Sequence, residues 1–406
     1  LIIIVDEASA IPDWPLHVKN LFDLFSRGVR FLLIVTGSLG LQLMEKASTL
    51  SGRRGNIPAL SRISNPGIIL PYKFSEYADI TRRVSRVIRR TGLLGRLRRY
   101  ETLVELTKFG LQTSKLESLE RAYERAKAIL ERLFNFYLIT GGYPLIIFNF
   151  FIENKSEFID PKWYGEFLDI ILEDMKYVNL RKEIGRHILE FIRDHGPSPL
   201  FNLKSISEYV HRIALTTRRE RSGIPVGRYV EYFINTFTML LAIEYRSVYG
   251  RGKYQEPEAR PFKLFIVDPF IFHSIFFSRK PDPFKAVSEF LNQPDKAGHL
   301  IEHTVCGHIL RLEHRPKVFY HVRKRGRGRD IGEIDCLYKI DATTWLALDV
   351  SYTSDVGRLR ASAERAIKCL EDLNLNGIRP LIISKGIFEI DESYCIIPAE
   401  AFLLLF

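Results

Sequence analysis

Two carboxylates stand at the end of the first apolar run of the chain. Asp6 and Glu7 directly follow Leu1–Val5, a run too short and too rich in β-branched residues for a helix. An apolar run without alternation is typical of a strand buried on both faces of a parallel sheet. Acids at the end of such a strand suit phosphate chemistry, in which one holds Mg²⁺ and the other polarises an attacking water. The alternative is that they only cap the following helix.

The next elements along the chain would place these acids at the edge of a sheet. His17–Gly28 has the apolar spacing of a helix, and Arg30–Ser38 repeats the design of an apolar strand that ends in small polar residues. A strand, a helix and a strand predict a right-handed parallel crossover, with a ligand site beyond the carboxyl ends of the strands. The side chains expected at that edge are Asp6, Glu7, Thr36 and Ser38.

Composition limits the class of protein. The chain has 406 residues, 46% hydrophobic residues and a formal net charge of +11, which fit a globular protein of several domains that favours polyanionic partners. The four cysteines lack zinc-knuckle or CxxC spacing, so we expect a reduced, cytoplasmic compartment. Glycine, proline and asparagine interrupt the most apolar stretch, Phe136–Ile152, which therefore predicts buried core rather than a membrane span.

Several short motifs, in order, resemble one family. The sequence is similar to the archaeal and bacterial AAA-type P-loop ATPases that carry a C-terminal domain of unknown function. The stretches that carry the resemblance are VDEASAIPDW, VTGS, LSGRRG, LPYKFSEY, TGGYP, GHLIEHTVCGHIL and GEIDCLYKI.

The resemblance implies ATP and Mg²⁺ as cofactors and assigns roles to several residues. Asp6 and Glu7 become the Walker B acids, of which Asp6 holds the metal and Glu7 is catalytic, and Thr36 and Ser38 become sensors near the γ-phosphate. Arg53 in LSGRRG would stabilise the transferring phosphoryl group, unless it is only a solvated loop residue.

The first motif of that family is not found in this sequence. No G-x-x-x-x-G-K-[ST] loop occurs among the 406 residues. In the family this loop precedes the Walker B strand, so we expect the chain to be an N-terminally truncated form of a longer ATPase. The alternative is a degenerate ATPase that is complete as it stands.

The middle of the chain predicts a helical region followed by a winged helix. The basic segment Thr81–Tyr100 could lie along phosphates, or its arginines could pair with the acidic helix Leu116–Leu133. Helices at Gly185–Gly196, Leu203–Ile213 and from Pro225, followed by a strand at Phe262–Pro269, have the order of a winged helix. Such a unit could bind DNA, with Arg228 and Arg251 as candidate contacts, or serve as a lid or interaction module.

The C-terminal part resembles the restriction-endonuclease-like fold. A helix, three strands, a helix and a strand are expected between Gly298 and Ser384, in the order αβββαβ. The resemblance implies a divalent metal held by Glu302, Asp335 and Asp349. Serine occupies position 351, where such enzymes carry a lysine, so we expect metal binding without efficient cleavage unless another cation, such as Lys368, substitutes. The candidate phosphate contacts beside this site are Arg323, Arg325 and Arg327.

Together these patterns predict an α/β protein with four regions: a partial P-loop sheet at 1–80, a helical lid at 81–184, a winged helix at 185–280 and a restriction-endonuclease-like domain at 281–406. The expected function is ATP binding and hydrolysis in the intact protein, coupled to DNA or to a partner protein and not to a membrane. The alternatives are a non-catalytic DNA-binding or interaction module and a metal-dependent nuclease.

Overall fold

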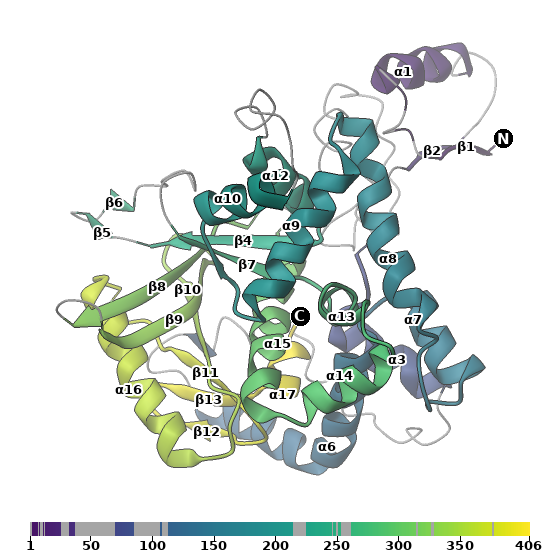
Figure 1. Cartoon of the computed structure of the whole chain (residues 1–406). Helices are drawn as coiled ribbons and strands as arrows, with labels where there is room; N and C mark the ends of the chain where they lie inside the picture. Colours follow the sequence, from purple (N-terminus) through teal and green to yellow (C-terminus); the bar gives the residue numbers. More distant parts are fainter. Residues whose placement is uncertain are drawn as a thin grey trace.

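The structure is a computed structural model of the whole chain (Figure 1). It describes residues 2–6, 8, 11, 13–25, 32–36, 70–84, 106–107, 113–213, 225–245, 247–248, 251–252, 261–313, 316–325, 329–375 and 377–406. The fold is mixed α/β, with one large sheet and helices packed around it.

The N-terminal residues form a small parallel unit, as the sequence predicts. Strand β1 (Ile2–Val5) pairs in parallel with β2 (Leu32–Val35), and helix α1 (Trp14–Phe25) connects them. Ala8, Trp14 and Val18 are buried under this pair and form its own small core. The prediction that this strand is buried on both faces is wrong, because the side of β1 that carries Ile2 and Ile4 is uncovered and these residues are 66% and 64% exposed.

A nine-stranded sheet organises the rest of the chain. Its strand order is β12-β13-β11-β10-β9-β8-β4-β7-β3. The bounds of these strands are β3 (Leu200–Phe201), β4 (Met239–Glu244), β7 (Phe262–Ile266), β8 (Val318–Arg325), β9 (Arg329–Lys339), β10 (Trp345–Val350), β11 (Leu381–Ser384), β12 (Glu389–Ile390) and β13 (Cys395–Pro398). A short separate hairpin, β5 (Ser247–Val248) and β6 (Arg251–Gly252), follows β4.

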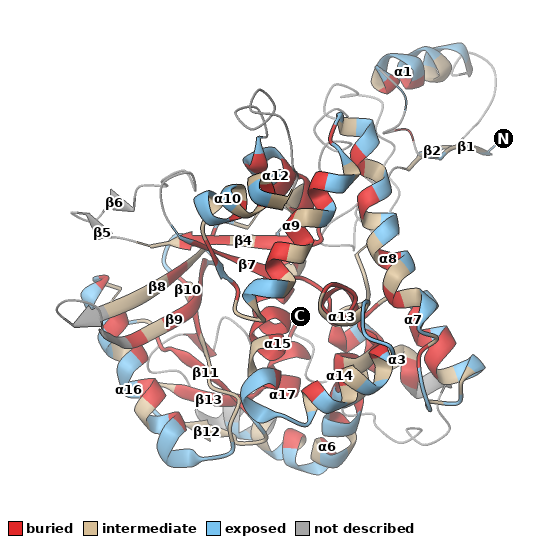
Figure 2. Cartoon of the chain, in the orientation of Figure 1, coloured by how far each residue is buried: buried red, intermediate tan, exposed pale blue. Residues whose placement is uncertain are grey.

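Helices cover this sheet and bury its apolar faces. Figure 2 shows buried residues along β4, β7, β10 and β11 and on the helices α13 (Pro269–Phe277), α15 (Pro294–Gly307) and α17 (Ala399–Leu403). The remaining long helices are α3 (Phe74–Val84), α6 (Thr113–Thr140), α8 (Lys162–Glu173), α9 (Lys182–His195), α10 (Leu203–Ile213), α12 (Val226–Asn235), α14 (Pro283–Leu291) and α16 (Val356–Asp372). One continuous core joins residues from Phe74 to Phe406.

The elements of the C-terminal part occur in the predicted order, with α15 followed by β8, β9, β10, α16 and β11. The pairs β8–β9 and β9–β10 are antiparallel, whereas β10–β11 is parallel across the α16 connection.

The predicted winged-helix region also has its expected elements. Helix α9 is followed by β3, then by α10 and α12, and then by β4 and β7, and the three strands pair antiparallel in the order β3-β7-β4. The apolar run after Pro225 does not continue as one helix, since α12 ends at Asn235 and β4 begins at Met239. Strand β4 also pairs in parallel with β8, so the sheet crosses the predicted boundary between residues 280 and 281.

Several of the motif stretches meet at one buried junction. The backbone of Tyr72, in LPYKFSEY, donates to the carbonyl of Gly142, in TGGYP. His308, from GHLIEHTVCGHIL, accepts from the backbone N–H of Phe74. A Cβ atom at Gly142 would lie 2.1 Å from the carbonyl oxygen of Tyr72, so only glycine permits this approach. These stretches therefore have a structural role, which is to join α3 and the end of α6 to the C-terminal part.

The apolar stretch Phe136–Ile152 is only partly buried. It turns at Gly141 from α6 into α7 (Pro144–Phe148) and a π-helical turn, and Leu145, Phe148 and Ile152 are about half exposed. Within the described residues no single helix is long and apolar enough to span a membrane. One sharply bent pair, Glu120–Thr140 with Pro144–Glu153, passes that test only when the two are taken together.

Candidate functional site

The C-terminal part contains a buried cluster of one lysine and several carboxylates. The Nζ atom of Lys263 lies 2.8 Å from Glu302 Oε1, 2.8 Å from Asp335 Oδ1 and 2.7 Å from Glu333 Oε1. The lysine side chain is only 5% exposed, whereas Glu333 is 43% exposed. The cluster therefore lies inside the protein but opens to solvent on the side of Glu333. We call these four residues, with Asp349, the carboxylate centre.

The regular geometry of the sheet brings three of the acids to one face. Glu333 and Asp335 are two residues apart on β9, so both point to the same side of the sheet. Leu348 of β10 pairs with Cys336 in the antiparallel ladder, which puts Asp349 opposite Asp335 on that side. The backbone N–H of Val350 also donates to Asp335 Oδ2 at 2.8 Å.

The other two members come from more distant elements. Glu302 lies in the middle of α15, which packs on the sheet and contacts β7, β9 and β10. Lys263 belongs to β7, which is separated from β9 by β4 and β8 in the strand order. Strands about 4.8 Å apart would put β7 roughly 14 Å from β9 in a flat sheet. That distance is longer than a lysine side chain, so the sheet must curl to bring Lys263 to Asp335.

The buried groups of the carboxylate centre change one another's pKa values. Burial disfavours the ammonium of Lys263, but Asp335, Glu302 and Glu333 around it raise its pKa well above the usual range. Burial also opposes the ionisation of Glu302, yet Lys263 and a hydrogen bond from His299 lower its pKa to about 2. Lys263 and Glu302 therefore form a charged pair at neutral pH.

Asp349 has a different environment from Glu302. Burial raises the pKa of Asp349 to about 6, against a hydrogen bond that its carboxylate accepts from Ser362. The hydroxyls of Ser362 and Ser351 are 2.9 Å apart, so Ser351 belongs to the same network. Lys368, the substitute considered from the sequence, is exposed on α16.

Close packing of α16 on β9 supports this network. A Cβ atom at Gly332 would lie 3.0 Å from Cys369 Sγ and 3.2 Å from the carbonyl of Arg365, both on α16. The absence of a side chain at Gly332 therefore lets the helix approach the strand, and the same helix carries Ser362 to Asp349.

The predicted nucleotide edge is described in part. Asp6 follows β1, Thr36 follows β2, and the hydroxyl of Thr36 donates to the carboxylate of Asp6. Backbone hydrogen bonds between the two strands continue past their ends. The Thr36 N–H donates to the carbonyl of Val5, and the Ala8 N–H donates to the carbonyl of Thr36. Glu7, Ser38 and Arg53 lie outside the described residues.

The candidate DNA contacts lie in different parts of the fold. Arg228 is exposed on α12 and donates to the carbonyl of Val178 at 3.3 Å, and Arg323 on β8 pairs with Asp372 at 2.6 Å. Arg251 is in the short hairpin and Arg325 is at the end of β8, but their side chains are outside the described part, as is Arg327 entirely. The structure thus gives Arg323 an acidic partner that the sequence did not predict.

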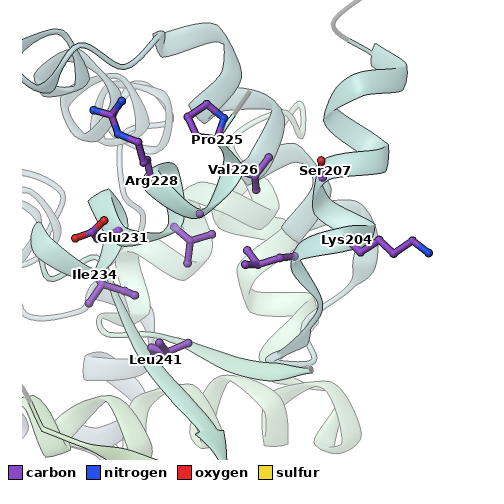
Figure 3. Close-up of a pocket in the computed structure, with 11 residues that line it drawn as sticks. Lys204, Ser207, Pro225, Val226, Arg228, Glu231, Ile234 and Leu241 are labelled. Atoms are coloured by element: carbon purple, nitrogen blue, oxygen red, sulfur yellow. The ribbon is translucent and has the colours of Figure 1, made fainter. Parts of the chain in front are cut away.

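A cavity of about 710 Å³ opens between α10 and α12 (Figure 3). Apolar side chains, among them Val226, Ile234 and Leu241, line it together with polar ones such as Lys204 and Arg228. The cavity is separate from the carboxylate centre, since the two share no residue.

Among the described residues, no group of three His, Cys, Asp or Glu side chains is arranged to hold a metal ion, and the ammonium of Lys263 is the cation between the acids. Comparison of the chain with protein-family models, with curated proteins and with solved structures gave no match.

The sequence pattern predicts Glu302, Asp335 and Asp349 as site residues but gives no role to Lys263 or Glu333. The sequence does contain a signal for Lys263, which is the single charged residue in the apolar strand Phe262–Ile266. In the structure all five residues of this strand are buried. A lysine is almost never fully buried unless it is paired, so such a residue requires an acidic partner elsewhere in the chain.

Proposed function

We propose that the β1–α1–β2 unit is the Walker B and sensor part of an AAA-type P-loop ATPase site. The observation that carries the proposal is the contact between Asp6 and Thr36 at the adjacent carboxyl ends of two parallel strands. In this assignment Asp6 holds the Mg²⁺ of MgATP, Glu7 polarises the attacking water, and Thr36 orients the carboxylate of Asp6. Ser38 and Arg53 complete the set by the resemblance of their motifs.

The test uses protein expressed from its native coding sequence, with any residues encoded ahead of Leu1. We expect Glu7→Gln to retain ATP binding and to lower hydrolysis by roughly 100-fold or more, the scale for loss of a positioned base. Asp6→Asn should weaken the Mg²⁺-dependent part of ATP binding. Asp13→Asn, an exposed change in the same unit, serves as the control. Hydrolysis by Glu7→Gln at the wild-type rate would overturn the assignment.

The carboxylate centre favours a second function, metal-dependent hydrolysis of phosphodiesters in DNA. The supporting observation is that a buried lysine lies among the acids although position 351 is serine. The acids supply oxygen ligands of the kind that a hard divalent cation binds, but the ammonium of Lys263 lies between them and no three of the described side chains are arranged around a metal position. Glu302, Asp335 and Asp349 are the residues that would hold the metal, which when bound would supply a Lewis acid and an activated water.

The reaction adds water across a P–O bond. The water oxygen bonds to phosphorus, the bond from phosphorus to the leaving oxygen breaks, the leaving oxygen takes a proton, and the second proton of the water goes to solvent. Within the centre, the carboxylates orient the site, and Lys263 offsets the negative charge that develops on the phosphate. The wide exposure of Glu333 gives a substrate a side from which to approach.

A Mg²⁺-dependent nicking assay on supercoiled DNA tests this second function. We expect nicking that Asp349→Ala abolishes and that Asp295→Ala, an exposed change at the start of α15, leaves intact. Nicking that persists in Asp349→Ala would assign the activity to another source.

A further inference from the structure

A row of apolar side chains on α7 and the π-helical turn after it faces solvent. Leu145, Phe148 and Ile152 are each about half exposed, whereas Ile146 and Phe150 between them are buried. Intervals of three and four residues put the exposed side chains on one side of the helical segment. A helix that lies in the groove of a partner presents its anchors with this spacing. We call Leu145, Phe148 and Ile152 the apolar row.

The cavity between α10 and α12 is lined by side chains that match such a row. Its apolar lining comes from α10, α12 and β4 and includes Leu203, Val226, Val230, Ile234 and Leu241. Its volume of about 710 Å³ is within the range of roughly 300–1,000 Å³ in which proteins enclose most of a ligand's surface. Figure 3 shows the ammonium of Lys204 pointing away from Ile234 and Leu241, so the charge stays outside the apolar part.

The charged residues beside the two features have complementary signs. The lining of the cavity includes two cations and one acid, namely Lys204, Arg228 and Glu231, and all three are exposed. The exposed charges directly after Ile152 are two acids and one cation, namely Glu153, Glu157 and Lys155. Opposite charges around an apolar contact favour the correct partner and suppress wrong ones.

We propose that the cavity between α10 and α12 is the docking site for the apolar row of a second copy of this chain. In Figure 1 helix α7 lies at the lower right and α10 and α12 lie near the top, so the row of one molecule does not reach its own cavity. A contact between two different surfaces is heterologous, and it builds a ring or a filament rather than a closed dimer. The inference is independent of both proposed functions, because neither the nucleotide edge nor the carboxylate centre contributes a residue to this contact.

Sedimentation of the full chain over a wide range of protein concentration tests the proposal. We expect the average mass of the wild type to rise with concentration. Phe148→Asp should raise the dissociation constant at least about ten-fold, because it replaces an aromatic anchor by a carboxylate that the apolar cavity cannot solvate. The matched control is Leu24→Asp, which changes a leucine of α1 that is 73% exposed and should leave assembly unchanged.

A second variant blocks the cavity rather than the row. Gly227 lines the cavity, and a Cβ atom there meets no atom within 4 Å, so Gly227→Phe adds a ring without a clash inside the folded chain. It should also raise the dissociation constant at least about ten-fold, because the ring takes up room that the row of the second copy needs. Leu145→Asp is the alternative change in the row if circular dichroism shows that Phe148→Asp does not fold.

Mixing the two variants distinguishes this contact from any other self-association. Phe148→Asp keeps an intact cavity and Gly227→Phe keeps an intact row, so each alone should be monomeric. Their equimolar mixture should form a heterodimer that grows no further, because only one row and one cavity remain intact. A wild type that stays monomeric up to its limit of solubility would overturn the proposal. Assembly that Phe148→Asp leaves unchanged, or a mixture that stays monomeric, would overturn it as well.

Discussion

Lys263 Nζ and Asp335 Oδ1 are 2.8 Å apart in the interior of the protein, although 72 residues separate them in the sequence. The contact joins β7 to β9 across two intervening strands of the sheet. Burial raises the pKa of Asp335 well above its usual range, against the attraction of Lys263, so Glu302, whose pKa is lowered to about 2, is the acid that balances the ammonium. This contact can form only in a curled sheet, and it places the positive charge of Lys263 among the acids of the carboxylate centre.

We expect loss of this lysine to be costly for the fold. Removing one partner of a buried ion pair leaves an uncompensated charge, so Lys263→Met should lower the free energy of unfolding by about 3–5 kcal/mol. Urea denaturation followed by circular dichroism measures the change, and Lys296→Met should remain within about 0.5 kcal/mol of the wild type. A loss below about 1 kcal/mol would mean that the acids are not held by this ammonium.

The sequence could predict one part of this site and not the other. Asp335 and Asp349 lie on neighbouring strands of one supersecondary unit, and the period of two residues per strand places them on one face. Lys263 comes from a strand that the sequence assigned to a different domain, and its contact depends on the β4–β8 pairing between the two units. Long-range parallel pairing leaves no local signal, so the sequence showed only a buried lysine that needed a partner.

The secondary structure was also predictable in one segment and not in another. Helix α10 has the predicted bounds Leu203–Ile213, because its apolar spacing is local. The run after Pro225 was harder to divide, since apolar residues fill both α12 and β4, and the break at Thr236–Thr238 contains no glycine or proline. The backbone turns there through Phe237, which has a φ of 55°.

A substitution at Gly142 tests the junction between the motif stretches. Any side chain at this position meets the carbonyl of Tyr72 at 2.1 Å, so Gly142→Ala should lower the free energy of unfolding by more than about 2 kcal/mol. Gly165→Ala is the matched control, because no atom lies within 4 Å of a Cβ atom there and the residue is inside α8. That control should raise stability by about 0.5–1 kcal/mol, since alanine favours a helix over glycine. Equal effects of the two changes would contradict the close approach.

Buried histidines should make the fold sensitive to mild acid. Burial lowers the pKa of His273 to about 4 and that of His308 to about 3, so both are neutral in the folded state. The unfolded chain, with a histidine pKa near 6.5, takes up these protons first as the pH falls, so stability is lost below about pH 6.5 and down to about pH 4. Each group contributes roughly 3 kcal/mol to that loss.

Asp268 acts in the opposite direction over a similar range. Burial raises its pKa to about 6, against hydrogen bonds from the backbone of Gly142 and Phe270, so its protonation offsets part of the loss between about pH 6 and 4. Denaturation curves recorded from pH 7 to pH 4 should show a smaller decrease in stability for His273→Gln than for the wild type. An unchanged slope would mean that His273 is not the group that takes up the proton.

Binding to DNA should depend more on Arg325 and Arg327 than on Arg323. Arg323 is 2.6 Å from the carboxylate of Asp372, so part of its charge is already offset within the protein. Arg325 and Arg327 belong to the basic run that joins β8 to β9. We expect Arg325→Glu and Arg327→Glu to weaken binding about equally for any DNA sequence and to reduce the salt dependence, because phosphate contacts carry no sequence information. Arg323→Gln should have a smaller effect.

A fluorescence anisotropy titration at several salt concentrations measures the affinity for DNA and its salt dependence. Salt-insensitive or undetectable binding by the wild type would contradict a DNA-contacting role for this strand.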